Sequence, residues 1–358
     1  MDLRETYQNK KVFVTGHTGF KGSWLITWLH SLGAAVKGYS LPVDDKDSLF
    51  SAIRGEELCE SVEGDVRDRI RLRNEILSFE PDFIFHLAAQ PLVRLSYEIP
   101  LETIEINSQG TANVLDALRF LSKPCVAVMI TTDKVYHNRE EEYAYTENDK
   151  LGGHDPYSAS KASAEIVIET YRKSFFNPET YIEHRKTVST ARAGNVIGGG
   201  DWAKDRIIPD IIRALVSGQA VEVRNPSSIR PWQHVLEPLQ GYLVLGAHQK
   251  REPNKYAESF NLGPYPDDVL QVHQLVEKAI DCWGSGSYFT PLKPHKLHEA
   301  NLLQLDISKA LSVLDWRPQM SAYQAIVMTV EWYKGYLRDN VDARTLIQMQ
   351  IEEFVKKG

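Results

Sequence analysis

Cysteine is scarce in this sequence, and the few cysteines are not spaced for crosslinks or metal binding. The 358 residues include only Cys59, Cys125 and Cys282, which lie far apart. An odd number of widely spaced cysteines argues against a disulfide framework and against a zinc site. We therefore expect no metal, and we expect three buried thiols in a reducing compartment.

Long apolar runs and an excess of positive charge are also missing. No segment is long and apolar enough to span a bilayer, and the first eleven residues lack the apolar region of a secretory signal. Lys and Arg number 41 against 48 Asp and Glu, which gives a net charge of −7. This balance argues against general binding to nucleic acid or to an anionic membrane. We expect a cytoplasmic protein, in which a local basic pocket can still bind phosphates.

The order of the short apolar segments predicts an α/β fold. Strands are expected at 11–15, 35–39, just before 63–66, 81–90, 126–130 and 187–191. Helical patterns are expected at 23–29, 101–121, 157–176, from 209, 269–283, 306–315, 320–337 and from 340. Strands that alternate with helices indicate a Rossmann-type doubly wound parallel sheet. We divide the chain into a dinucleotide-binding domain, 1–190, and a mainly substrate-binding region, 191–358, and note that a core strand can recur at 260–263.

A glycine-rich loop follows the first predicted strand. Gly16, Gly19 and Gly22 have the spacing G-x-x-G-x-x-G and lead into an apolar-periodic helix. Glycine allows a sharp turn and a close approach to a pyrophosphate, and the helix N-terminus presents free N–H groups to that anion. The combination of strand, glycines and helix predicts a dinucleotide site, with a plain strand–helix turn as the alternative.

The ends of the next strands carry weaker signals for the cofactor. Ser40-Leu41-Pro42 stands where NAD-binding chains often carry Asp or Glu, and Asp44 and Asp45 come later, so the choice between NAD and NADP is poorly encoded. No arginine stands at this strand end to bind the 2′-phosphate of NADP, which weakly favours NAD. Asp65 can accept from an adenine amino group or cap the next helix. The fourth predicted strand runs through Leu87-Ala88-Ala89-Gln90 and ends in small residues, which allow a flat cofactor to approach the backbone. His86 within the same run is predicted to be a core histidine.

Two stretches supply candidate catalytic groups. Thr132-Asp133-Lys134 follows the fifth predicted strand, where α/β enzymes place their chemistry. Tyr157 and Lys161 are four residues apart and so share one face of a helix. A Tyr–Lys pair with this spacing is usually structural, but one arrangement explains both stretches: the helix lays Tyr157 beside Thr132, with Lys161 beneath the phenol. Asn107 interrupts the preceding helical segment, and we favour a structural role for it.

The later part of the chain gathers arginines among prolines and aromatics. Arg206, Arg224 and the segment Arg230-Pro231-Trp232-Gln233-His234 lie there. The forked donors of arginine suit a diphosphate, although any single arginine is more often a solvated surface residue.

Together these motifs resemble the extended short-chain dehydrogenase/reductase family. The resemblance covers the chain from the first strand to about Pro318 and includes Arg192-x-x-Asn195-x-x-Gly198. Nucleotide-sugar 4,6-dehydratases of this family carry Thr-Asp-Glu after the fifth strand, and Lys134 replaces the glutamate here. Lysine at this place, with the loop 16–22 and the segment 230–234, is similar to dehydratases that act on CDP-glucose for bacterial O-antigen dideoxysugars.

The resemblance implies NAD as cofactor, CDP-glucose as substrate, and a homodimer or homotetramer that pairs the helices containing Leu101 and Tyr157. Tyr157 would remove the 4-hydroxyl proton, with Lys161 lowering its pKa, and Thr132 would orient the 4-oxygen. Asp133 would protonate the leaving 6-hydroxyl, while Lys134 would be the C5 base or only stabilise the enolate. The implied cofactor-binding residues are Gly16, His17, Thr18, Gly19, Phe20, Gly22, Asp65, Val66, Leu87, Ala88, Tyr157 and Lys161. The implied substrate-binding residues are Asn195, Arg206, Arg224, Arg230 and His234.

Two other functions fit parts of the pattern. A nucleotide-sugar 4-epimerase or reductase would keep Thr132, Tyr157 and Lys161, but it needs no acid and base for C5 and C6, so Asp133 and Lys134 argue against it. A non-catalytic NAD sensor would not need Tyr157 or Lys161, and both are present.

Overall fold

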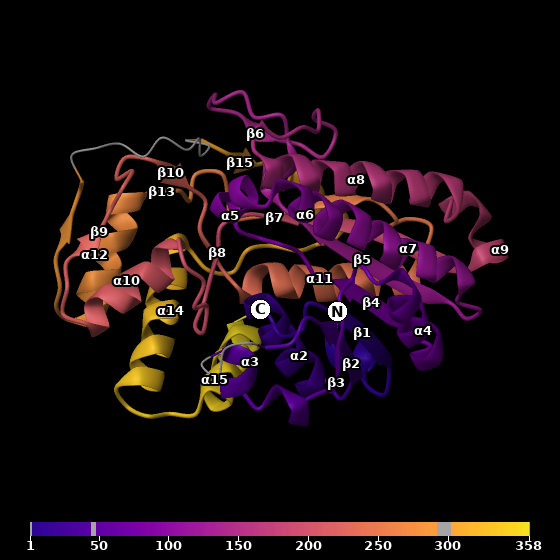
Figure 1. Ribbon diagram of the computed structural model, residues 1–358, viewed down its shortest axis with the longest axis horizontal. Coiled ribbons are helices and arrows are strands. Elements are labelled where there is room, and N and C mark those ends of the chain that lie inside the picture. Colours follow the sequence, from indigo (N-terminus) through magenta and orange to yellow (C-terminus); the bar gives the residue numbers. More distant parts are fainter. Residues whose placement is uncertain (1, 44–47, 292–301, 358) are drawn as a thin grey trace.

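A parallel sheet of seven strands forms the centre of the molecule (Figure 1). The computed structural model describes residues 2–43, 48–291 and 302–357. The strands are β12 (Ser259–Leu262), β7 (Lys186–Ala193), β5 (Cys125–Thr131), β4 (Phe83–His86), β1 (Lys11–Thr15), β2 (Ala35–Ser40) and β3 (Glu60–Glu63), in that spatial order. Neighbours pair in parallel throughout. This is the predicted doubly wound arrangement, in which ligands bind beyond the carboxyl ends of the strands.

Successive side chains of a strand point to opposite faces of the sheet. In the central strands both sets of side chains are apolar, so both faces of the sheet are apolar. In β1, Val12 and Val14 join one hydrophobic cluster, whereas Phe13 joins the other. Val128 and Met129 of β5 divide in the same way. Strands buried on both sides read as continuous apolar runs, which is why the sequence identified them.

Helices cover each face of the sheet. One face packs against α2 (Phe20–Ser31) and α11 (Leu236–Arg251), and α15 (Ala343–Lys357) lies on α2. The other face carries α4 (Arg69–Phe79), α7 (Gly110–Phe120) and α8 (Pro156–Ser174). Shorter helices at the edges are α1 (Leu3–Tyr7), α3 (Leu49–Ala52), α5 (Val93–Glu98), α6 (Pro100–Ile104) and α9 (Tyr181–His184).

A smaller region lies beside the sheet, on the left of Figure 1. Its helices are α10 (Ile207–Val216), α12 (Val272–Trp283) and α14 (Ala322–Leu337), with α13 (Ser308–Val313) beside β12. Two-stranded pairs complete it: β9 (Val221–Glu222) with β14 (Tyr288–Phe289), β10 (Ile229–Arg230) with β13 (Leu270–Gln271), β8 (Val196–Ile197) with β11 (Gln233–His234), and β6 (Ala144–Tyr145) with β15 (Gln304–Leu305). Because β12 returns to the main sheet, the later part of the chain also contributes to the core. The division at residue 190 stays a prediction.

The amino-terminal end of the chain differs from expectation, whereas the helix expected from residue 340 is confirmed by α15. The polar first residues form α1 rather than running straight into a strand, because Asp2 caps the helix and Tyr7 is buried on α11. The polar C-terminal helix buries Ile347, Ile351 and Phe354, which share one face. The three cysteines are free, but only Cys125 is fully buried. Within the described ranges, no helix combines the length and apolarity that a membrane crossing requires.

Candidate active site

The glycine loop makes a tight turn at the carboxyl end of β1. Gly16 has φ of +73°, and a Cβ there would lie 2.7 Å from the backbone nitrogen of Ala88 at the end of β4. A Cβ on Gly22 would lie 2.1 Å from the carbonyl oxygen of Gly16. Gly19 caps α2 without a side-chain hydrogen bond, so the first N–H groups of the helix have no side-chain cap. The loop therefore has the geometry of a pyrophosphate-binding turn, with Phe20 opening the helix.

His17 and Thr18 fasten this loop to the neighbouring strands. The His17 ring lies against Gly38, and its Nε2 is 2.8 Å from the hydroxyl oxygen of Ser61. Burial lowers the pKa of His17 to about 4, so the ring is neutral. The Thr18 hydroxyl is 2.8 Å from that of Ser40, at the end of β2 where the sequence left the cofactor choice open. Asp44 and Asp45 lie outside the described residues.

Asp65 does not cap α4, because Asp68 is the N-cap and accepts from the backbone N–H of Arg71. The Asp65 carboxylate is instead held by the side chain and backbone of Arg67, whose hydrogen bonds keep the pKa of Asp65 below its usual value. The helix-cap interpretation is therefore wrong, and adenine binding by Asp65 stays a prediction. Val66 follows it and is buried next to Gly110.

Two polar residues near β4 have the structural roles that the sequence favoured. The ring nitrogens of His86 are 2.7 Å from the Thr15 hydroxyl and 3.1 Å from the Thr111 hydroxyl. Asn107 lies in a π-helical segment, Glu105–Gln109, between α6 and α7. Its side chain bonds both backbone groups of Gln90 and donates to Ser160 on α8, so it ties the widened helix turn to its neighbours.

Thr132, Asp133, Lys134 and Tyr157 line one cavity of about 680 Å³. Beyond β5 the chain makes a 3-10 turn, Asp133–Val135, in which the Thr132 hydroxyl donates to Asp133 Oδ1 at 2.8 Å. Lys134 Nζ donates to the same oxygen at 3.2 Å. The phenol of Tyr157 hydrogen-bonds with Thr132. Both predicted catalytic stretches therefore meet at the carboxyl end of the sheet.

Burial dominates the ionisation of the Tyr157 helix face. It raises the pKa of Tyr157 to about 12, although the Thr132 hydrogen bond and the charge of Arg206 act in the opposite direction. Burial also lowers the pKa of Lys161 to about 8, while Glu165 acts to raise it. Lys161 Nζ donates to the carbonyl of Ile130 at 3.2 Å. The expected lowering of the Tyr157 pKa is thus absent in the protein alone, because desolvation of the phenol outweighs the favourable contacts.

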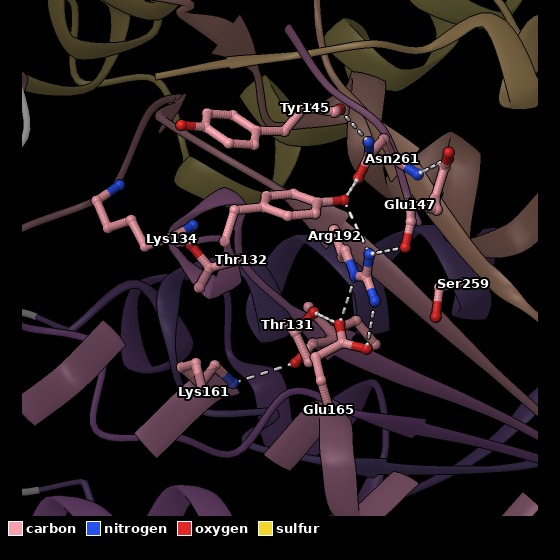
Figure 2. A network of polar contacts seen from close by, with 12 residues as sticks. Thr131, Thr132, Lys134, Tyr145, Glu147, Lys161, Glu165, Arg192, Ser259 and Asn261 are labelled. Carbon is pink, nitrogen blue, oxygen red and sulfur yellow. Dashed lines mark hydrogen bonds and ion pairs between the residues drawn. The ribbon is translucent and has the colours of Figure 1, made fainter. Parts of the chain in front are cut away.

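A buried ion pair braces this site from below (Figure 2). Glu165 is one helical turn beyond Lys161 and accepts from the Thr131 hydroxyl at the end of β5. Arg192 of β7 binds its carboxylate through two nitrogens, at 2.9 and 3.0 Å. Arg192 also donates to the Tyr136 hydroxyl at 2.8 Å, and that hydroxyl donates to Asn261 of β12 at 2.6 Å. The network links α8 to the ends of three strands, and so fixes the helix that carries Tyr157.

Removing one member of this pair should destabilise the fold. Both side chains are at most 4% exposed, so Glu165→Gln leaves Arg192 with an uncompensated buried charge. We expect a loss of about 3–5 kcal/mol in the free energy of unfolding, measured by urea denaturation. Glu169→Gln on the same helix breaks an exposed pair with Lys173 and should cost about 0.3–0.5 kcal/mol. Equal losses in the two variants would contradict the bracing role.

The arginine-rich segment supplies much of the opposite wall. Arg206, Arg224, Arg230 and Asn195 line the cavity as expected. Arg206 pairs with Asp201 at 2.7 Å, and Arg224 pairs with Asp205 at 3.2 Å.

His234 does not line the substrate cavity. It is fully buried in β11, with its ring edge-on to Trp24 at 5.6 Å between centroids. Burial lowers its pKa to about 3. Because β11 pairs with β8 inside the molecule, the structure contradicts the expectation that His234 binds substrate.

Sequence reasoning missed three cations that line the cavity, which are Lys21, Arg94 and Lys204. Lys21 lies in the first turn of α2, and burial together with Arg206 and Lys161 lowers its pKa to about 7. Cations are disfavoured at a helix N-terminus, so a lysine directly after a nucleotide loop was an available signal. Arg94 of α5 reaches Asp205 at 3.0 Å, a contact that only the tertiary fold reveals.

Comparison with known proteins agrees with this architecture. A family model described as GDP-mannose 4,6 dehydratase matches residues 13–329. CDP-glucose 4,6-dehydratase from Salmonella typhimurium is 48% identical over 332 residues, which cover 93% of this chain and 92% of that protein. dTDP-glucose 4,6-dehydratase from Streptomyces antibioticus is 28% identical over 333 residues, with coverage of 90% and 92%.

Solved structures share the fold. dTDP-glucose 4,6-dehydratase from Streptomyces venezuelae, solved with NAD bound, has a TM-score of 0.77 at 23% identity and covers 92% of this chain and 99% of its own. UDP-glucose 4-epimerase from Thermotoga maritima has a TM-score of 0.75 at 20% identity, with coverage of 92% and 100%. Because one fold serves both reactions, the residues of the site must decide between them.

Proposed function

The chain belongs to the GDP-mannose 4,6-dehydratase family of extended short-chain dehydrogenases/reductases, and we propose that it converts CDP-glucose to CDP-4-dehydro-6-deoxyglucose. The reaction removes water from C5 and C6 of a nucleotide sugar. One observation carries the choice of a dehydratase over an epimerase: Asp133 and Lys134 enter the same cavity as Thr132 and Tyr157. Oxidation at C4 needs only the last two, whereas elimination needs an acid and a group acting at C5. Cytidine as the base follows the 48% identical relative.

NAD is the cofactor, and the glycine loop fits it. The close contacts of Gly16 and Gly22 leave room for backbone only, and the start of α2 offers N–H groups to a pyrophosphate. We assign its binding to the loop residues Gly16–Phe20 and Gly22, to Asp65 and Val66, to Leu87 and Ala88, and to Tyr157 and Lys161. When bound, NAD supplies the hydride acceptor for oxidation at C4 and the donor for reduction at C6.

The side chains of the chain divide the proton transfers. Tyr157 takes the proton of the 4-hydroxyl, and Thr132 orients the oxygen through its hydroxyl. The resulting 4-ketone acidifies the C5 proton, which leaves with the help of Lys134. Asp133 gives a proton to the 6-hydroxyl, so that the C6–O bond breaks and water departs. The substrate diphosphate is the ligand that best matches Arg206, Arg224 and Arg230, with Asn195 beside the sugar.

A product assay tests this function. The protein is incubated with CDP-, dTDP-, UDP- and GDP-glucose and with catalytic NAD, and products are analysed by mass spectrometry. We expect the loss of one water from CDP-glucose, without net formation of NADH. An unchanged mass with inversion at C4 would indicate an epimerase, and no turnover of any sugar by NAD-loaded protein would overturn the enzymatic function.

Lys134 should be required for chemistry at C5. We expect Lys134→Met to slow the incorporation of solvent deuterium at C5 by about 10²–10⁴-fold in a single turnover, because a positioned acid or base contributes that much. Lys134→Arg then separates the two roles, since arginine keeps the charge but cannot lose its proton. If Lys134→Arg keeps the exchange at C5, Lys134 acts by stabilising the enolate. If both variants lose the exchange, Lys134 is the base that removes the C5 proton. Wild-type exchange in the methionine variant would remove Lys134 from the reaction.

We further propose that two chains pair through α6 and α8, as the family resemblance implies. Leu101 is 69% exposed on α6 and Ile166 is 56% exposed on α8, and the two helices contact each other. Leu101→Glu with Ile166→Glu should therefore yield a particle with the mass of one chain in light scattering, because charges at the centre of an apolar interface are not tolerated. Ile182 is 89% exposed on α9, outside the two helices. Ile182→Glu is therefore the matched control and should keep the assembly. An unchanged mass in the double variant would contradict this interface.

A further inference from the structure

A small second cavity lies against Asp133. Asp133 and Gly194 line both this cavity and the substrate cavity, and Gln233 lines only the small one. Its volume of about 10 Å³ is close to the space that one water molecule requires. The wall continues from these buried residues to Tyr265, which is 41% exposed. The small cavity therefore runs from the catalytic carboxyl group toward the surface.

Two buried acceptor atoms of this cavity have no partner in the described protein. They are Asp133 Oδ2 and Gln233 Oε1, on side chains that are 1% and 2% exposed. The orientation of the Gln233 amide is fixed, because its Nε2 donates to the carbonyls of Gly194 at 3.3 Å and Leu262 at 3.0 Å. Gly194 in turn touches Asp133, since a Cβ there would lie 2.2 Å from Oδ2. Buried polar atoms are normally satisfied by protein or by ordered water.

We propose that one water molecule binds between Asp133 Oδ2 and Gln233 Oε1 and returns a proton to Asp133 after each elimination. This proposal rests on the dehydratase function given above. Water has two protons to donate, and the site offers two acceptors. Asp133 Oδ1 is already engaged by Thr132 and Lys134, and substrate fills the larger cavity during turnover, so the small cavity is the free route to solvent.

The proton balance of this step is closed. Asp133 gives its proton to the 6-hydroxyl, and water leaves as the C6–O bond breaks. The bridging water then forms an O–H bond to Oδ2 with one of its own protons while it takes a proton from solvent, so no hydroxide remains. A half turn of the carboxyl group, whose terminal torsion is soft, brings the new proton to the substrate side. Over one cycle, the proton that Tyr157 takes from the 4-hydroxyl balances the proton that Asp133 gives to the leaving 6-hydroxyl.

Gln233→Leu removes one acceptor of the bridging water, and a comparison of single with multiple turnovers isolates the return of the proton. In a single turnover Asp133 still holds its proton, so we expect C4 oxidation and water elimination at the wild-type rates. Under multiple turnover we expect the rate of dehydration to fall by roughly 10-fold, with a larger solvent deuterium isotope effect; this loss is smaller than the one expected from removing the acid itself. Gly263→Ala provides a variant that touches neither polar group. Its Cβ would meet Leu305 at 3.7 Å, an ordinary contact, and would narrow the small cavity, so we expect the same selective slowing. Gln249→Leu controls for the loss of a buried glutamine elsewhere and should leave the ratio of the single-turnover to the multiple-turnover rate unchanged.

A high-resolution crystal structure supplies a readout that is independent of activity. It should show a water within hydrogen-bonding distance of both atoms in the wild type, and no such water in Gln233→Leu. An empty site in the wild type, or wild-type rates of dehydration under multiple turnover in both Gln233→Leu and Gly263→Ala, would overturn the relay. If the wild type itself dehydrates no nucleotide sugar, the proposed function has failed instead.

Discussion

Replacing Tyr157 by phenylalanine should stop the reaction before any ketone forms. The substitution removes one hydroxyl from a residue that is only 8% exposed, so the packing of α8 is kept. Without the phenol, no side chain takes the proton of the 4-hydroxyl, and we expect the rate of C4 oxidation to fall by about 10²–10⁴-fold. Reduction of quenched reactions with borodeuteride measures this step directly, because deuterium enters the sugar only where a 4-ketone exists.

The pH dependence provides a second test of the same role. A base must first lose its own proton, and burial raises the pKa of Tyr157 to about 12. The wild-type rate of C4 oxidation should therefore rise from about pH 6 to about pH 7, the range in which Lys161, with a pKa of about 8, keeps most of its charge. The residual rate of Tyr157→Phe should not rise. If the rate of C4 oxidation rises equally with pH in the wild type and in Tyr157→Phe, another group takes the proton.

Thr131→Val is a matched control for this experiment. Its hydroxyl donates to Glu165 beneath the site and is absent from the proposed proton transfers. The variant should lose stability, because one acceptor of the buried ion pair loses a donor, but it should retain C4 oxidation near the wild-type rate. A collapse of C4 oxidation in Thr131→Val as well would mean that Tyr157→Phe reports on disturbed packing.

The parts of the molecule that the sequence predicted are those with a local cause. Strands buried on both faces, such as β1, β4 and β5, read as short apolar runs, and a turn as tight as the one at Gly16 admits only glycine. Tyr157 and Lys161 were recognised because the helical period alone places them on one face. Extending that period by one more turn reaches Glu165. The helical spacing could therefore also have pointed to the residue that supports the site from beneath.

The parts that were missed or wrong depend on distant packing. His234 has the polarity of a ligand-binding residue, but the pairing of β11 with β8 buries it against Trp24, 210 residues earlier in the chain (234 − 24). Arg94 reaches the cavity only because α5 lies opposite the segment that carries Asp205. The raised pKa of Tyr157 has the same origin, since desolvation depends on everything packed around the phenol. None of these features has a signature in neighbouring residues.

Asp133→Asn should block the cycle one step later than Tyr157→Phe. Asparagine keeps the size of the side chain and an oxygen for the Thr132 hydrogen bond, but it has no proton to give to the leaving hydroxyl. C4 oxidation should continue, while water elimination falls by about 10²–10⁴-fold. Borodeuteride should then place deuterium at C4 of a hexose that still carries its 6-hydroxyl, in an amount near one per active site.

A change of leaving group makes this test specific for the acid. Fluoride needs less protonation than hydroxide to depart, so CDP-6-deoxy-6-fluoroglucose should restore most of the elimination rate in Asp133→Asn. The same substrate should not rescue Tyr157→Phe, which fails before the C6 bond is involved. If Asp133→Asn eliminates fluoride from the fluorinated sugar as slowly as it eliminates water from CDP-glucose, the aspartate acts on an earlier step. The acid must then be another group of the cavity. Rescue confined to Asp133→Asn would fix both the order of the two proton transfers and the side chain responsible for each.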